Sequence, residues 1–288
     1  MPVQTVVLPV DFSERSQGAA RYAEALSALF GGRIHLIHVL PPPHYEMGAL
    51  EVGGAMLADL FRARQEQANQ DLQTFLAAEL PEERTERILL EGDPAAKIVE
   101  YAHNVSADLI VMPTHGYGTF RRFILGSVTA KVLHDADCPV WTGVHLESHS
   151  VEQVRFRNIC AAVDLGPQSE RTLMWASRFA AATQARLYLA HATPRVDGRG
   201  VDYVDPEWQA EIDRTAREQI QALIDRLQIK AEVRVDAGDA AACICELARE
   251  LDSDVLVIGR GSASGVFGRL RASAYSIIRM SACPVVSV

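Results

Sequence analysis

Short apolar runs rich in β-branched residues alternate with longer amphipathic segments through the first half of the chain. The apolar runs predict strands at residues 5–10, 33–40, 86–90, 108–112 and 139–144. The amphipathic segments predict helices at Ser16–Phe30, Met56–Leu80, Pro94–Asn104 and Ser127–Asp135. At the third helix, Gly92-Asp93-Pro94 supplies a capping carboxylate and then a proline. The alternation predicts a doubly wound α/β fold, with helices on both faces of a five-stranded parallel sheet.

The same order of segments recurs in the second half of the chain. The matching pairs are Thr5–Asp11 with Asn158–Asp164, Arg33–Val39 with Arg186–Ala192, Glu91–Ala102 with Ala237–Ala248, and Ala107–Pro113 with Ser253–Gly259. Such self-similarity indicates a tandem repeat of one unit. We therefore predict two domains, at residues 1–147 and 154–288, joined by a polar linker at 148–153.

Composition and charge restrict the class of protein. Of the 288 residues, 48% are hydrophobic, which is ample for two globular cores. The net charge is -9, and the sequence contains no basic block that would bind nucleic acid. No segment approaches the roughly 18 apolar residues of a membrane span, and the N-terminus lacks a signal-like pattern, so a cytoplasmic protein without a membrane partner is expected. Five cysteines without metal-ligand spacing predict reduced, mostly buried thiols.

The segment PTHGYGTFRRFILGS, residues 113–127, follows the predicted fourth strand and ends where a helix begins. Ligands of doubly wound sheets bind beyond the carboxyl ends of the strands. Glycines there let an anionic oxygen approach the main chain, and Ser127 at a positive helix end can cap the helix or donate to a phosphate. Arg121 and Arg122 add charge. The segment has the composition of a phosphate cradle, although a structural turn with solvated arginines remains the alternative.

Three other nucleotide or catalytic motifs do not fit. A P-loop needs a lysine before the serine, and Leu125-Gly126-Ser127 lacks it. The dinucleotide-binding fingerprint needs a glycine where Arg121 stands. The segment Gly261–Gly265 has the outline of a nucleophile elbow, but its central residue is Ala263.

The glycine spacing resembles that of the universal stress protein family, whose nucleotide-binding members carry G-x2-G-x9-G-S/T after the fourth strand. Gly116 precedes Gly126-Ser127 at that spacing, and Pro113 stands at the position of the first glycine. The other matching segments are Val10-Asp11-Phe12-Ser13, His38-Val39, Gly92-Asp93-Pro94 and the late Cys-Pro-Val of the chain. The resemblance spans essentially the whole chain, and it implies two adenine nucleotide alpha hydrolase-like domains.

The resemblance also implies a binding site for an adenine nucleotide, with ATP, with or without magnesium, as the expected ligand. Asp11 would contact the ribose or adenine, and the backbone of Val39 would contact the adenine. The residues that would cradle ribose and phosphates are Gly116, Gly126, Ser127 and Val128. Pro113 has no N–H and therefore removes one contact from this cradle. The two domains are expected to pair as the homodimers of the family do, through the strands after Pro139 and Pro284. Association of two whole chains into a homodimer is a further alternative.

The second copy has a weaker version of this site. Its loop, residues 259–273, keeps Gly259 and Ser273 but has Ser262 and Ala272 at the other glycine positions. Asp164 matches Asp11. We predict a second, more degenerate site at Asp164, Gly259 and Ser273.

Structural roles compete with these assignments. Asp11 and Asp164 could instead cap the turns that follow them. His38 and His191 are expected to be histidines with satisfied hydrogen bonds rather than metal ligands. The connections at 41–55 and 193–206 are either lids or variable crossovers.

The sequence favours an adenine-nucleotide-binding regulator of the stress response, with the N-terminal site dominant. The loop is accompanied by no evident catalytic base, nucleophile or metal-carboxylate set. We therefore assign no catalytic or metal-binding residue and expect at most weak ATP hydrolysis. The alternative is a scaffold or dimerising stress protein with degenerate, non-binding sites. Fold analogy cannot separate the two.

Overall fold

The computed structural model describes residues 3–42, 54–114, 125–143, 154–195, 206–260 and 272–288. They fall into two compact units, essentially residues 2–142 and 155–288, which we call the first and second domains. The predicted linker at 148–153 lies outside the described residues, so the predicted domain limits, 1–147 and 154–288, stay a prediction.

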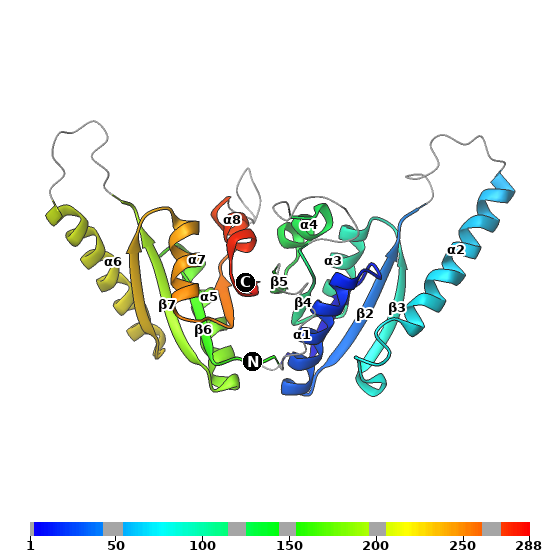
Figure 1. The fold of residues 1–288 in the computed structure, drawn as a ribbon, viewed down its shortest axis with the longest axis horizontal. Coiled ribbons are helices and arrows are strands. Elements are labelled where there is room, and N and C mark those ends of the chain that lie inside the picture. The colour runs from blue at the N-terminus through cyan, green and yellow to red at the C-terminus, as the bar shows by residue number, and fades with distance from the viewer. Residues whose placement is uncertain (1–2, 43–53, 115–124, 144–153, 196–205, 261–271) are drawn as a thin grey trace. The chain divides into compact units, whose positions relative to one another are not determined.

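The first domain alternates strands with helices (Figure 1). Its elements are β1 (Thr5–Pro9), α1 (Glu14–Phe30), β2 (Arg33–Leu40), α2 (Gly54–Thr74), the 3-10 helix η2 (Glu82–Arg84), β3 (Thr85–Glu91), α3 (Pro94–Asn104), β4 (Leu109–Val111), α4 (Ser127–Asp135) and β5 (Val140–Thr142). The strands pair in parallel in the order β3-β2-β1-β4-β5. The strand order therefore reverses between β1 and β4.

The second domain repeats this arrangement. Its elements are β6 (Asn158–Ala162), α5 (Ser169–Thr183), β7 (Arg186–Thr193), α6 (Pro206–Leu227), β8 (Glu232–Ala237), α7 (Ala240–Glu250), β9 (Val255–Ile258), α8 (Ala272–Met280) and β10 (Val285–Ser287). The parallel strand order β10-β9-β6-β7-β8 places the reversal between β6 and β9. The predicted doubly wound α/β fold is confirmed in both halves.

Helices cover both faces of each sheet, because right-handed crossovers place α1 and α2 on one face and α3 and α4 on the other. The contacts between α3 and α4, and between α7 and α8, agree with this arrangement. On the central strand β1, Val6, Val7 and Leu8 are all fully buried although their side chains point alternately to the two faces. Burying each such side chain stabilises the fold by roughly 1.5–3 kcal/mol.

Helix α2 ends earlier than its apolar pattern predicts, at Thr74 rather than Leu80. Leu76 adopts a left-handed conformation, with φ of 56°, which a continuing helix does not allow. Arg87 of β3 donates hydrogen bonds from Nη1 to the carbonyl oxygens of Leu72 (2.5 Å) and Phe75 (2.6 Å). A residue distant in the sequence therefore caps this helix, and the local pattern could not reveal it.

The predicted cap of the third helix and the predicted buried thiols are confirmed. Asp93 caps α3, with its Oδ1 accepting from the amide of Ala96 at 2.9 Å, and Pro94 stands at the first helical position. All five cysteines are free thiols, and four of them are buried. Among the helices that the structure describes, none has the length and apolar character needed to cross a bilayer.

Candidate functional site

The switch point between β1 and β4 is where a doubly wound sheet forms its ligand crevice. Asp11 follows β1, Val39 lies near the carboxyl end of β2, and Ser127 and Val128 open α4. The fold therefore gathers these predicted residues around the carboxyl edge of one sheet. Gly116, the other glycine of the predicted cradle beside Gly126, lies outside the described residues. Arg121 and Arg122 lie outside them as well.

Asp11 holds the turn between β1 and α1. Its Oδ1 accepts hydrogen bonds from the hydroxyl of Ser13 (2.6 Å), the amide of Ser13 (3.1 Å) and the hydroxyl of Ser16 (3.0 Å). The matching Asp164 uses Oδ1 in the same way, accepting from the amide of Gly166 at 2.9 Å and the hydroxyl of Ser169 at 3.2 Å. The capping role that competes with ligand contact is thus present in both copies, and it orients each carboxylate at the crevice.

The residue after each of these aspartates has a left-handed backbone. Phe12 has φ of 63° and Leu165 has φ of 58°, although neither side chain favours that region. The ring of Phe12 stacks on His38 at a centroid distance of 4.2 Å and meets the edge of Phe75 at 5.4 Å. Such strain persists only where surrounding contacts fix the backbone, and it is concentrated at functional sites.

The two repeated histidines have satisfied hydrogen bonds, as predicted. Nδ1 of His38 lies 2.8 Å from the carbonyl oxygen of Val10, and Nδ1 of His191 lies 2.8 Å from that of Val163. Because a carbonyl oxygen only accepts, Nδ1 carries the proton in both rings. Burial lowers the pKa of His38, so its imidazole is neutral at pH 7. Each histidine ties the end of one strand to its neighbour beside the crevice.

The first turn of α4 is tied to the end of β4. Gly126 is the N-cap, Ser127 is the first helical residue, and the amide of Gly126 donates to the carbonyl oxygen of Thr114 at 2.9 Å. The hydroxyl of Thr129 donates to the carbonyl oxygen of Pro113 at 3.0 Å. Ser127 therefore does not cap the helix. The amides of the first helical residues have no partner within the helix and point toward its positive end, where an anion binds favourably.

Gly126 has φ of -59° and ψ of 145°, a conformation that any residue can adopt. Its backbone therefore does not require glycine. A site in which a ligand approaches the main chain closely would require the absence of a Cβ at this position.

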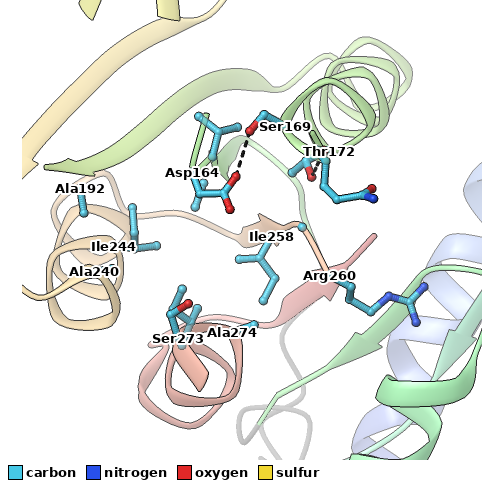
Figure 2. A pocket seen from close by; sticks show the side chains of 15 residues that line it. Asp164, Ser169, Thr172, Ala192, Ala240, Ile244, Ile258, Arg260, Ser273 and Ala274 are labelled. Carbon is cyan, nitrogen blue, oxygen red and sulfur yellow. Dashed lines mark hydrogen bonds between the residues drawn. The ribbon is translucent and has the colours of Figure 1, made fainter. Parts of the chain in front are cut away.

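A cavity of about 110 Å³ lies at the switch point of the second domain (Figure 2). All three residues of the predicted second site, Asp164, Gly259 and Ser273, line it. Most of the other lining residues are apolar or hydroxylic, and they include Ser169, Thr172, Ala192, Ala240, Ile244, Ile258, Ala274 and Ile277. The guanidinium of Arg260 points away from Asp164 in Figure 2. The repeated sequence thus forms a pocket at the predicted place.

Packing explains the glycine at 259. A Cβ on Gly259 would lie 2.9 Å from Oγ1 of Thr172, closer than such atoms approach. Thr172 is held by a hydrogen bond from its hydroxyl to the carbonyl oxygen of Gln168 at 3.0 Å. Sequence reasoning missed Thr172 and the apolar lining residues Ile244 and Ile277. The sequence signal for these three residues is weak. They line the cavity only because of the face that each helix turns toward it.

A larger hollow, of about 490 Å³, lies beside the end of α2 in the first domain. Phe12 and residues 74–79 line it together with Asp71, and none of the predicted nucleotide contacts does. Most of its lining residues belong to the turn that ends α2. We therefore place the candidate site at the switch point and not in this hollow.

The described residues carry little reactive chemistry. Burial raises the pKa of Cys245 and of Cys283 to about 11, so these thiols stay protonated at neutral pH. Within the described part of the chain, no three His, Cys, Asp or Glu side chains gather closely enough to hold a metal ion. The arrangement is suited to binding at polar backbone groups.

Comparison with known proteins gives consistent matches over both domains. A model of the universal stress protein family matches residues 2–142 and 155–288. A universal stress protein of Mycolicibacterium smegmatis is 26% identical and covers 98% of this chain and 96% of its own length. Universal stress protein MJ0531 of Methanocaldococcus jannaschii is 32% identical over 47% of this chain and 78% of its own.

The solved structures agree in fold. The crystal structure of a universal stress protein from Archaeoglobus fulgidus DSM 4304 superposes with a TM-score of 0.72 at 23% identity. The match covers 100% of this chain and 98% of the other. At this identity the likeness concerns the fold alone.

Proposed function

This chain belongs to the universal stress protein family, and we propose from that premise that it binds an adenine nucleotide and acts as a regulator of the stress response. We take ATP as the ligand and the first domain as the main site. The nucleotide would occupy the crevice between β1 and β4, with its adenine beside Val39, Asp11 at the ribose and its phosphates at the N-terminus of α4.

One observation carries this proposal. In the second domain, an aspartate after the first strand, a glycine after the fourth and a serine at the start of the following helix line one cavity. The first domain has Asp11 directly after the loop end of β1 and Ser127 at the start of α4, while Pro113 stands where the second domain has Gly259. Where the sequence repeat keeps these positions, we infer that the fold keeps a pocket.

The first domain is better suited to an anionic ligand. Gly126 leaves room for a phosphate oxygen at the start of α4, where Ala272 stands in the second domain. The amides of Ser127 and Val128 lie at the positive helix end. A magnesium ion would arrive with the triphosphate, whose oxygens are among its preferred ligands.

The site supports binding more than turnover. Asp11, the carboxylate beside the crevice, already accepts three hydrogen bonds through Oδ1, so that oxygen is committed to the turn. A general base must reach the proton that it removes and have a pKa near the working pH. We therefore propose that nucleotide occupancy changes the shape or partner of the protein, with at most weak ATP hydrolysis.

A scaffold with degenerate sites is the second candidate, and one contact favours it. The amide of Gly126 donates to Thr114 and is not available to a phosphate in this arrangement. Pro113 contributes no N–H at all. If ATP cannot displace the Thr114 contact or use the next amides of α4, the first domain would be a structural module.

Calorimetric titration with ATP and magnesium tests the proposal, with Gly126→Val as the matched variant. Because the backbone of Gly126 suits any residue, the valine should block phosphate approach without straining the backbone, and its melting temperature is compared with that of the parent. We expect binding by the parent protein and a loss of at least tenfold in the variant. No binding by the parent protein would overturn the proposal and leave the scaffold.

A further inference from the structure

The cavity of the second domain has a polar wall, formed by α5 and the turn before it (Figure 2). The hydroxyl of Ser169 donates to Oδ1 of Asp164 at 3.2 Å, and the hydroxyl of Thr172 donates to the carbonyl oxygen of Gln168 at 3.0 Å. A carboxylate and a carbonyl oxygen only accept, so both hydroxyl protons are used inside the domain. Ser169 and Thr172 are buried and line the cavity together with Asp164. This wall therefore offers oxygen lone pairs to a ligand.

The rest of the cavity is mostly apolar. Four buried aliphatic side chains from α7, β9 and α8 line it, namely Ile244, Ile258, Ala274 and Ile277. Asp164 is exposed to solvent, so its carboxylate lies where the cavity opens. The guanidinium of Arg260, the other charged lining residue, points away from Asp164 in Figure 2. A ligand that fits would place an apolar body among the isoleucines and a polar head group at the opening.

The volume of the cavity restricts the ligand to a small molecule. Ligand pockets of proteins usually measure roughly 300–1,000 Å³, and an engineered apolar cavity of about 150 Å³ holds one benzene molecule. The cavity of the second domain measures about 110 Å³. By the benzene comparison, it has room for a body of about five carbon atoms. The enclosed space is therefore far smaller than a nucleotide.

The polar wall distinguishes between head groups. An ammonium group has three N–H donors and no acceptor, so it matches both the lone pairs of the wall and the negative charge of Asp164. A phosphate or carboxylate would meet lone pairs and a like charge there. Gln168 and Ser273, which also line the cavity, can donate as well as accept and do not reverse this preference. The positive end of α7 is already capped by Asp239, whose Oδ1 accepts from the amide of Ala242 at 3.0 Å.

The first domain has only part of this wall. Helices α1 and α5 match residue by residue, which pairs Ser16 with Ser169, and each of these serines donates to the aspartate that precedes its helix. The same alignment places Ala19 where the second domain has Thr172. Thr172 in turn requires a glycine opposite, because a Cβ on Gly259 would lie 2.9 Å from its Oγ1. The acceptor at Thr172 therefore belongs to the second domain.

We propose that the cavity of the second domain is a separate binding site for a small primary amine in its ammonium form, with a short aliphatic body. The ammonium group lies at the opening against Asp164, with the oxygen atoms of Ser169 and Thr172 as further acceptors. The aliphatic body packs against Ile244 and Ile277. This inference goes beyond the proposed nucleotide function and does not depend on it, because it concerns a different ligand in the other domain.

NMR titrations of the full chain with three probes test the proposal. Isoamylamine, isoamyl alcohol and isovalerate share one aliphatic body and differ in the head group. We expect the amine to shift the amide signals of Ser169 and Ile277 and to bind about fivefold more tightly than the alcohol, since an ion pair at an exposed carboxylate adds only a few-fold in affinity. We expect no binding of the acid. Absence of amine binding, or equal affinity for the amine and the alcohol, would overturn the proposal.

Matched variants locate the site. Asp164→Asn keeps an acceptor for the turn but removes the charge, and it should weaken amine binding about fivefold while leaving the alcohol unchanged. Asp11→Asn makes the same change in the first domain and should alter neither constant. Equal losses in both variants would place the amine elsewhere and overturn the proposal. Ala274→Leu fills the cavity and should abolish binding of both probes, which keeps the test available if Asp164→Asn does not fold.

Competition with ATP separates this proposal from the nucleotide function. We expect saturating ATP and magnesium to leave the amine bound, because the nucleotide occupies the first domain. Displacement of the amine from the signals of Ser169 and Ile277 by ATP would show that the cavity is a nucleotide site, and it would overturn the amine proposal. A chain that binds the amine but no ATP would overturn the proposed nucleotide function alone.

Discussion

The hydroxyl of Thr129 donates a hydrogen bond to the carbonyl oxygen of Pro113 over 3.0 Å. Both residues are buried, and the bond joins the first turn of α4 to the end of β4. Together with the bond from the amide of Gly126 to Thr114, it fixes both ends of the connection that the sequence singles out as a phosphate cradle. Pro113 thus contributes an acceptor to the structure at the position where the family resemblance expects a glycine.

Removing that bond should destabilise the first domain and loosen the site. Thr129→Val keeps the shape of the side chain but leaves the buried carbonyl of Pro113 without this donor, which costs about 1–3 kcal/mol. Thr129→Ser keeps the hydroxyl and serves as the control. We expect chemical denaturation to show a clear loss for the valine variant and a smaller one for serine. Equal stability of the two would show that the bond contributes nothing.

The left-handed residue after Asp164 offers a test of backbone strain. Leu165→Asn places a side chain that tolerates φ of 58° at this position and should raise the free energy of unfolding by about 1 kcal/mol. The corresponding change Phe12→Asn should lower stability instead, because it removes the ring that contacts His38 and Phe75. Thermal unfolding of both variants measures the contrast. A stabilising Phe12→Asn would mean that those ring contacts are negligible.

The neutral state of His38 predicts a dependence of stability on pH. Its pKa is lowered from the ordinary 6.5 mainly by burial. As the pH falls, the unfolded chain therefore binds a proton at this histidine before the folded chain does. The stability associated with the neutral ring is therefore present above pH 6.5 and is lost as the pH falls below that value. His38→Asn keeps an N–H donor for Val10 without titrating.

Unfolding by urea at several pH values measures this effect. The stability of the parent protein relative to His38→Asn should decline from about pH 7 to about pH 5. A difference that stays constant over this interval would argue that His38 titrates equally in the folded and unfolded chains.

The second domain leaves no room for a side chain at position 259. Gly259→Ala should cost about 1–3 kcal/mol through the clash of the new Cβ with Oγ1 of Thr172. Thr172→Ala removes the clashing atom, so the double variant should recover part of this loss. A double-mutant cycle on the free energy of unfolding measures the coupling. Strict additivity would place the strain elsewhere.

The architecture could be predicted from the sequence because its signals are local and repeated. Strand and helix periodicity, the capping aspartate at 93 and the doubling of the chain all reappear in the structure. The end of α2 could not be predicted, since it depends on Arg87, which reaches the helix from β3. The left-handed conformation of Phe12 was equally hidden, because phenylalanine does not favour that region.

The candidate site was predicted in position but not in detail. Asp164, Gly259 and Ser273 were identified by their place in the repeat, and they line one cavity. Thr172 and Ile277 became visible only when the helices were placed around the strand ends.

A crystal structure of the full chain grown with ATP and magnesium is the most direct test of the central claim. We expect a nucleotide in the first domain, with its phosphates at the amides of Ser127 and Val128 and its adenine beside Val39. A nucleotide bound in the hollow beside α2, or a crevice between β1 and β4 that stays empty at saturating ATP, would contradict it.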